Sequence, residues 1–196
     1  MSNSIAVVTG AGSGIGRAIA LALAEQGDRV VVADLDLQAA EKTAAERPDR
    51  LFPMTVDVAD RTQVDALRDR VTTEVGVANI LVNAAGWDRT DQFLNATTEF
   101  AEKVVAINYL GPVHMCSAFL PGMVEAGGGG RVVNLASDAG RVGSAGESIY
   151  AGAKGGVSNT LVVGGALSQG DYGVTSASPP RNAHGAIDLG TGALLP

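Results

Sequence analysis

The sequence has little of what defines several other classes of protein. One cysteine, Cys116, occurs in 196 residues, which excludes a disulfide or a cysteine-based zinc site within one chain. We expect it to be a buried, unreactive thiol. Charged residues are only 18%, which excludes a coiled coil, and the net charge is −7 without any basic run. Nucleic acid is therefore not expected as a partner.

Signals that direct a chain to a membrane are also absent from the sequence. The first four residues lead directly into an apolar segment, with no basic region and no cleavage site, so we expect no secretion. The longest stretch without charge, Val104 to Val124, contains glycine, proline and polar residues. It is too polar and interrupted for a membrane span. We expect a cytoplasmic protein without a membrane partner.

What the chain does contain is a regular alternation of apolar segments and segments with helical periodicity. Apolar residues are 46%, aromatic residues 4%, and there are 26 glycines, a composition that favours helices packed closely on a parallel sheet. Because parallel neighbours need helical crossovers, we predict one α/β domain over residues 1–196. Its sheet is doubly wound and parallel, with helices on both faces. The predicted strands are 5–9, 29–33, 51–58, 80–82 and 131–137, and the predicted helices are 15–26, 37–46, 61–75, 97–123 (with a break considered at Gly111-Pro112) and one from about Ser148.

A glycine-rich turn connects the first strand to the first helix. Residues 9–16 read Thr-Gly-Ala-Gly-Ser-Gly-Ile-Gly. Gly10 suits a tight turn, Gly14 allows the backbone to approach a pyrophosphate, and Gly16 allows close packing of helix and sheet. The helix N-terminus adds free N–H groups and a positive dipole end. This context predicts a Rossmann-like dinucleotide site rather than a purely structural turn.

Asp34 ends the second predicted strand, 18 residues after Gly16. A carboxylate there accepts hydrogen bonds from the ribose hydroxyls of NAD and repels the additional phosphate of NADP. Arg17 is a contrary signal, because a cation beside the glycine turn favours a 2′-phosphate. We predict NAD as the cofactor, with NADP the less favoured alternative.

Three further residues suggest chemistry. Tyr150 and Lys154 are four residues apart on a predicted helix and share a face. A tyrosine with an ordinary pKa of about 10 is a poor catalyst at neutral pH, but a neighbouring ammonium stabilises its phenolate. By spacing alone, a Tyr and a Lys four residues apart are more often just a pair on a helix surface. Ser137 ends a strand at the carboxyl edge of the sheet, where ligands of such folds bind, and its hydroxyl suits a substrate oxygen.

These residues together resemble the short-chain dehydrogenase/reductase family over about residues 4–157. The resemblance implies that Tyr150 is the acid–base, that Lys154 assists it and holds the nicotinamide ribose, and that Ser137 orients the substrate oxygen. Asn108 would support a water in a proton relay; the residues alone would suggest a helix kink. The motifs that carry the resemblance are residues 9–16, Asp57-Val58, Asn83-Ala-Ala-Gly86, Asn108, Ser137 and Tyr150-Ala-Gly-Ala-Lys154.

The same resemblance implies the remaining cofactor contacts. Asp57 would bind the adenine amine with Val58 beside it, although without the family Asp57 would be interpreted as a strand-end cap. Ala84 replaces the second asparagine usual in the family, which removes a stabilising contact but no reacting group. No metal site is predicted. The predicted cofactor-binding residues are Gly10, Ser13, Gly14, Ile15, Gly16, Asp34, Leu35, Asp57, Val58, Asn83, Ala85, Gly86, Tyr150 and Lys154.

Some segments indicate a substrate class. Residues 85–88, 120–125 and 136–143 resemble the NAD-dependent 2-hydroxycyclohexanecarboxyl-CoA dehydrogenases and, less closely, the 3-oxoacyl-carrier-protein reductases, which use NADPH. Both act on the secondary alcohol of a β-hydroxyacyl thioester, so this small-molecule class is the predicted substrate. Trp87 either walls the pocket or packs under a loop. His114 and His184 have no predicted chemical role.

The resemblance stops after Val157. Residues 158–196 contain Gly164 and Gly165 mid-helix and a Ser-Pro-Pro-Arg segment in place of an apolar strand, so the last strand is expected to be missing or altered. A one-base frame slip, a truncation and natural divergence all fit. The resemblance implies a homodimer or homotetramer, weakened if the last strand is lost. A cofactor-binding protein with little or no catalysis is therefore the alternative of another class.

Overall fold

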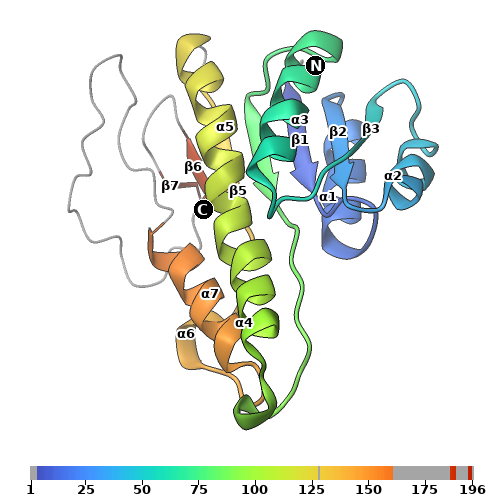
Figure 1. The fold of residues 1–196 in the computed structure, drawn as a ribbon. Helices are drawn as coiled ribbons and strands as arrows, with labels where there is room; N and C mark the ends of the chain where they lie inside the picture. The colour runs from blue at the N-terminus through green and yellow to red at the C-terminus, as the bar shows by residue number, and fades with distance from the viewer. Residues whose placement is uncertain (1–3, 128, 161–185, 189–193, 196) are drawn as a thin grey trace.

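The computed structural model describes residues 4–127, 129–160, 186–188 and 194–195. Five strands lie parallel in the order β3-β2-β1-β4-β5, and two short antiparallel strands continue the sheet beyond β5. The predicted doubly wound α/β fold is confirmed (Figure 1). The strands are β1 (Ile5–Thr9), β2 (Arg29–Asp34), β3 (Leu51–Thr55), β4 (Ile80–Asn83), β5 (Arg131–Asn134), β6 (Ala186–Asp188) and β7 (Leu194–Leu195).

Helices cover both faces of this sheet. The helices are α1 (Gly14–Glu25), α2 (Leu37–Ala44), α3 (Arg61–Glu74), α4 (Thr98–Val105), α5 (Gly111–Glu125), α6 (Ala139–Val142) and α7 (Ser148–Thr160), with a 3-10 turn η1 (Phe93–Asn95) and a π-helical turn η2 (Ala106–Leu110).

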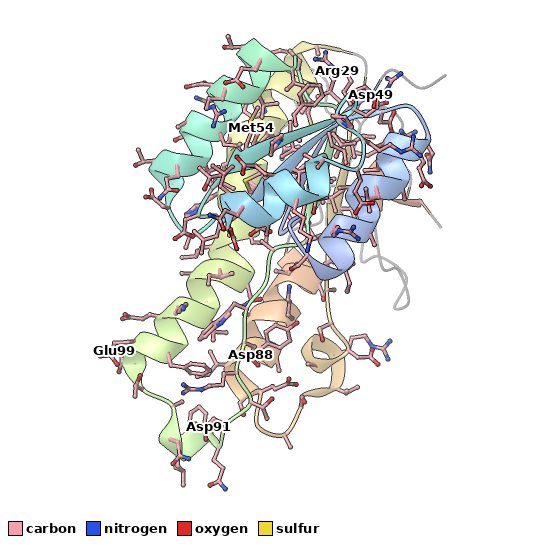
Figure 2. The ribbon with its side chains drawn as sticks, turned by 90° about the vertical axis from the view of Figure 1, so that its right-hand side faces the viewer. Arg29, Asp49, Met54, Asp88, Asp91 and Glu99 are labelled. Carbon is pink, nitrogen blue, oxygen red and sulfur yellow. The ribbon has the colours of Figure 1, made fainter. Side chains whose placement is uncertain are left out.

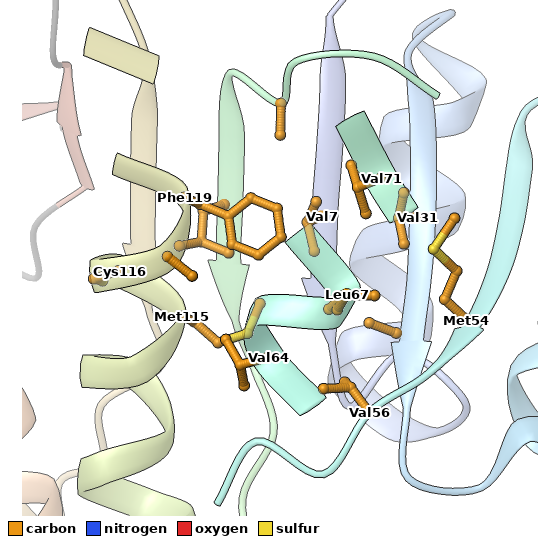
Figure 3. Close-up of a cluster of buried hydrophobic side chains, with 14 of the residues drawn as sticks. Val7, Val31, Met54, Val56, Val64, Leu67, Val71, Met115, Cys116 and Phe119 are labelled. Carbon is orange, nitrogen blue, oxygen red and sulfur yellow. The ribbon is translucent and has the colours of Figure 1, made fainter. Parts of the chain in front are cut away.

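Two hydrophobic clusters lie on opposite faces of the sheet. Alternate residues of β1 and β2 point to each face, so Val7 and Val31 join one cluster while Val8 and Val32 join the other. On the first face α3 and α5 pack over the sheet through valine, methionine and phenylalanine side chains (Figure 3). On the second face α1 and α2 contribute only alanines to the buried set. Small side chains there allow these helices to lie close to the strands that bear the glycine-rich turn.

The long helical segment predicted at 97–123, with a break considered at Gly111-Pro112, is present as α4, η2 and α5. The chain does not break at Gly111-Pro112 but passes through the π-helical turn η2, where the Gly111 N–H donates to the carbonyl of Ala106, five residues earlier. Proline has no N–H and crowds the preceding turn of a regular α-helix. The wider turn absorbs this conflict and keeps α4, η2 and α5 continuous. Asn108 lies inside this turn and is fully buried.

The strand ends also differ from the prediction. β3 stops at Thr55 and β5 at Asn134, so the residues at 56–58 and 135–137 leave the sheet at its carboxyl edge. The antiparallel strands β6 and β7 were not predicted, and they fall in the region expected to have lost or altered its last strand. His184 and the expected divergence at 161–185 lie outside the described residues.

The segment at 104–124 was expected to be too polar for a membrane span, but it lies in a helix of the described part of the chain, Thr98–Glu125, that meets the length and hydropathy of one. Its apolar residues include Met115, Cys116 and Phe119, which are buried against the sheet. Core packing therefore accounts for its composition, and a core helix passes the same test.

Candidate functional site

A cavity of about 410 Å³ opens at the carboxyl edge of the parallel strands. Ligands of open α/β sheets bind at this edge, near the point where strand order reverses, here between β1 and β4. Seven further residues outside the predicted cofactor set reach the cavity, from the ends of β2, β3, β4 and β5 and from α4 and η2. The predicted residues that line it are Gly10, Ser13, Gly14, Ile15, Gly16, Asp34, Leu35, Asp57, Val58, Ala85 and Gly86.

The glycine-rich turn is packed so tightly that side chains are excluded at two positions. A Cβ on Gly16 would lie 2.4 Å from the carbonyl oxygen of Gly10, and a Cβ on Gly10 would lie 2.9 Å from the Cα of Ala85. Gly14 has a φ of +54° and nothing within 4 Å of its Cβ position, which is open space. The turn thus presents bare backbone and the start of α1 to the cavity, as a pyrophosphate requires.

Asp34 holds this turn from the end of β2. Its Oδ2 accepts the N–H of Gly12 at 2.8 Å, and its Oδ1 accepts the N–H of Asp36 at 3.0 Å. Arg17, the contrary signal for NADP, is paired with Glu46 on the surface. Its charge is therefore compensated within the described chain, which leaves Asp34 as the charged group at this end of the cavity.

The segment after β4 forms the opposite wall. Thr9 accepts the N–H groups of both Ala84 and Ala85 at 3.1 Å, which ties the segment to β1. The side chain of Asn83 does not line the cavity; its Nδ2 donates to Asn134 at 2.7 Å and lies 3.6 Å from the Sγ of Cys116. Burial raises the pKa of the Cys116 thiol to about 11, which keeps it protonated and unreactive.

Asp57 and Val58 are held in place by their neighbours. The Oδ1 of Asp57 accepts the N–H of Ala59 at 2.9 Å, so this carboxylate is a turn cap as well as a cavity residue. His114 lies with its Nδ1 3.1 Å from the carbonyl oxygen of Val58. The histidine thus contacts a predicted cofactor-binding residue through its backbone.

Close helix packing brings together the elements that carry or adjoin the predicted catalytic residues. A Cβ on Gly140 would lie 2.6 Å from the backbone nitrogen of Gly155, so α6, which follows Ser137, rests against the backbone of α7. The ring of Tyr109 lies over Gly156, where a Cβ would be 2.9 Å from Cε2. The turn that contains Asn108 is therefore also seated on α7, the helix that carries Tyr150 and Lys154.

Lys154 is 4% exposed and its Nζ donates to the carbonyl oxygen of Leu135 at 2.9 Å. Burial lowers the pKa of this lysine. The ammonium lies 5.7 Å from the ring centroid of Tyr150, a distance at which a cation and an aromatic face attract each other. Ser137 is half-buried, and its Oγ accepts the N–H of Ala139 at 3.2 Å. Its hydroxyl proton remains available to a ligand.

Asn108 joins the long helix to the cavity wall. Its Oδ1 accepts the N–H of Trp87 at 3.2 Å, while its Nδ2 donates to the carbonyls of Trp87 at 2.6 Å and Val104 at 2.9 Å. Both amide protons are used, so any further ligand of this side chain must donate to Oδ1. A Cβ on Gly86 would lie 3.0 Å from that oxygen and 3.7 Å from the Nζ of Lys154.

Trp87 combines the two roles considered for it. It lines the cavity, and its ring meets that of Phe100 edge-on at 5.7 Å. Asp88 and Asp91 follow on the segment that runs between α4 and α7 (Figure 2). Both line a second, much smaller cavity with Tyr150. This segment places Trp87 between the cavity and the helix that carries Lys103.

Several residues that line or support the cavity were not singled out from the sequence. Thr9 was named only as part of the glycine motif, and its buried hydroxyl is a structural link whose partners are more than 70 residues away. Lys103 and Ile107 are four residues apart in the predicted helix that contains Asn108. Their spacing could have shown that they share one face of that helix. Leu135 lies two residues before Ser137, and its backbone oxygen holds Lys154.

The residues present fit a bound dinucleotide. The open glycine turn suits a pyrophosphate, Asp34 suits a ribose diol, and Asp57 and Val58 border the same cavity. Across the described residues no group of three or more acidic, histidine or cysteine side chains could hold a metal ion.

Comparison with known proteins agrees with this geometry. A family model described as short chain dehydrogenase matches residues 4–175. The chain is 42% identical over 138 residues to the probable oxidoreductase EphD of Mycobacterium tuberculosis, which covers 69% of this chain and 23% of EphD. It is 40% identical over 162 residues to D-threitol dehydrogenase of Mycolicibacterium smegmatis, and the match covers 80% of this chain and 61% of that enzyme. It is 32% identical over 155 residues to the mouse 3-oxoacyl-[acyl-carrier-protein] reductase, and the match covers 79% of this chain and 65% of that enzyme.

A solved structure shows the same relation. The short chain dehydrogenase/reductase of Burkholderia phymatum, in complex with NAD, superposes with a TM-score of 0.77 at 31% identity and covers 80% of this chain and 57% of that one. The chain therefore spans less than two thirds of the length of these relatives.

Proposed function

This chain belongs to the short-chain dehydrogenase family, and from that premise we propose that it interconverts a secondary alcohol and a ketone with NAD. The observation that supports the proposal is the packing of α6 and η2 on α7, the helix of Tyr150 and Lys154, together with the hydrogen bond from Lys154 to the cavity residue Leu135. NAD is favoured over NADP because Asp34 faces the cavity whereas Arg17 is paired with Glu46.

The chemistry follows from the one proton and one hydride that leave the alcohol. Oxidation of a secondary alcohol removes the hydroxyl proton and a hydride from the same carbon. When bound, NAD supplies the acceptor of the hydride. Tyr150 accepts the hydroxyl proton at its phenolate oxygen, and the Lys154 ammonium stabilises that phenolate. Ser137 donates its free hydroxyl proton to the substrate oxygen and orients it.

In this proposal Asn108 positions other groups and does not itself react. Its side chain fixes both backbone groups of Trp87, so it holds the wall segment against η2. A water in the proton relay would use the remaining lone pair on Oδ1. Lys154 keeps two ammonium protons beyond the one given to Leu135, which suits a ribose hydroxyl and the relay.

For the substrate we propose a β-hydroxyacyl thioester such as a hydroxyacyl-CoA. The resemblance of residues 85–88 to hydroxyacyl-CoA dehydrogenases supports it, as does a relative named as an oxoacyl-carrier-protein reductase. The runner-up is that reductase activity with NADPH. A relative named as a polyol dehydrogenase supports the secondary alcohol without the thioester. We further propose a cytoplasmic homodimer or homotetramer, which size-exclusion chromatography with light scattering tests.

The decisive experiment follows NADH formation from NAD and a panel of hydroxyacyl-CoA thioesters and polyols. With the best substrate, Tyr150→Phe is expected to lower kcat by at least about a thousandfold and leave the Kd of NAD within about twofold. Tyr109→Phe is the matched control, because its ring packs on α7 but its hydroxyl has no assigned role. Unchanged turnover in Tyr150→Phe contradicts the assignment. Binding of NAD without turnover of any substrate supports the alternative of a cofactor-binding protein with little catalysis.

A further inference from the structure

Lys103 is the cation among the described residues that line the dinucleotide cavity. The charged side chains that share this lining are Asp34 and Asp57. Both of these belong to the strand ends of β2 and β3, whereas Lys103 comes from α4. Neither the proposed reaction nor the dinucleotide contacts assigned above use this lysine.

One aromatic ring contacts the ammonium of Lys103, an otherwise exposed residue. Its Nζ lies 4.1 Å from the ring centroid of Trp87, and that ring meets Phe100 edge-on with an interplanar angle of 62°. Arg89 lies 5.1 Å from the Phe100 ring. A cation over an aromatic face is oriented by the ring but keeps its full charge. The arrangement therefore presents a positioned, uncompensated ammonium at the cavity.

Neighbouring acids do not neutralise this charge. No described carboxylate lies within ion-pairing distance of Lys103, whereas Arg89 reaches Asp91 at 3.8 Å. Glu99, one helical turn before Lys103, is engaged with Thr97 and its own backbone N–H at the start of α4, which holds its pKa below the ordinary value.

We propose that Lys103, seated on Trp87, binds a phosphate of the carrier in a hydroxyacyl thioester substrate. A lysine ammonium is a compact point charge that suits phosphate. Carriers such as CoA bear phosphates, whereas polyols bear none, so this residue would select the thioester class. The inference rests on the proposed function, and it makes Lys103 a specificity-determining residue rather than a catalytic one.

Binding of the carrier alone tests the inference without turnover. Calorimetric titration in the presence of NADH should give the chain a Kd for CoA about three- to tenfold lower than for pantetheine, which lacks the phosphates. In Lys103→Met that ratio should fall to about one, with the Kd of NADH unchanged. Lys42→Met, which removes an exposed lysine of α2, is the control for overall charge.

Equal binding of CoA and pantetheine by the unaltered chain overturns the inference, as does a CoA preference that survives in Lys103→Met. A loss of NADH affinity in Lys103→Met without any change in that ratio also overturns it, and assigns the lysine to the dinucleotide phosphates instead.

Turnover then separates this inference from the proposed function. Lys103→Met should raise KM for 3-hydroxybutyryl-CoA about three- to tenfold, with kcat and the KM for 3-hydroxybutyryl-N-acetylcysteamine unchanged. If neither thioester is oxidised, the proposed substrate fails while the CoA titration still decides the role of Lys103. If both are oxidised and Lys103→Met raises both KM values equally, the proposed function stands and the phosphate contact is wrong.

Discussion

The dinucleotide side and the catalytic side of the site are held in different ways. On the dinucleotide side, hydrogen bonds fix the walls: Asp34 binds the Gly12 N–H, and Thr9 binds two N–H groups beyond β4. On the catalytic side, glycine contacts between helices seat the residues, as at Gly140 against α7. The sheet itself follows this division, because β1, β2 and β4 are buried almost throughout while β5 begins with the exposed Arg131.

This contrast teaches that two kinds of close approach have different tolerances. Where backbone meets backbone inside the sheet layer, no atom can move without shifting a strand. Where a helix face is open, as at Gly152 in α7, nothing lies within 4 Å of the Cβ position. The same glycine-to-alanine change should therefore have opposite effects at a crowded position such as Gly16 and at an open position such as Gly152.

Gly16→Ala tests the contrast most strongly. Its Cβ would meet the Gly10 carbonyl at 2.4 Å, and relief of this overlap should lower the free energy of unfolding by about 2–3 kcal/mol and weaken NAD binding. Gly152→Ala should instead raise it by about 0.5–1 kcal/mol, because alanine is favoured over glycine in an open helix. Urea denaturation and NADH titration measure both. A similar loss of stability in the two variants would contradict the proposed difference between crowded and open glycine positions.

Asp34→Ala isolates the hydrogen-bonded wall. We expect about a tenfold rise in the Kd of NAD, from the loss of a charged acceptor, and a smaller preference over NADP because the repulsion of its phosphate is removed. Fluorescence titration with NADH and NADPH measures the change. Asp36→Ala is the control: Asp36 caps α2 by accepting from Gln38 and Ala39, so stability should fall by about 1 kcal/mol with cofactor preference retained. A preference unchanged in Asp34→Ala would refute the role of this carboxylate.

The smallest expected effect is the contribution of Cys116 to the pH dependence of the free energy of unfolding, and it tests the core between the two sides. Burial raises the pKa of its thiol to about 11, from an ordinary value of 9.0. The folded state therefore favours the neutral thiol, and the stability this provides is present below pH 9 and is lost as the pH rises through 11. Between pH 8 and 10 the loss should be about 1 kcal/mol, measured by urea denaturation. Cys116→Val should lack this component, and identical alkaline slopes would show that the thiol is not buried as described.

Much of the fold was predictable because its signals are local. The alternation of apolar strands and helices, the glycine turn before α1, and Asp34 at the end of β2 are all readable over a few residues. Strand ends were less predictable: β3 and β5 stop before their apolar runs do, because neighbouring strands end there and pairing stops. The long helix was predicted, but periodicity left a break at Gly111-Pro112 open, because it does not reveal the π-helical turn that accommodates Pro112.

The candidate site likewise has features that short sequence spacings predict and features that they do not. The sequence by itself determined the fold class, the dinucleotide turn and which residue types are available for chemistry, because these depend on short spacings. Tertiary structure alone decided how Arg17, Asn108 and Lys103 are used. Arg17 meets a glutamate 29 residues away, Asn108 clamps a backbone 21 residues away, and Lys103 rests on Trp87. Such partners are set by how helices cross the sheet, since the crossing, and not the local sequence, decides which side chains meet.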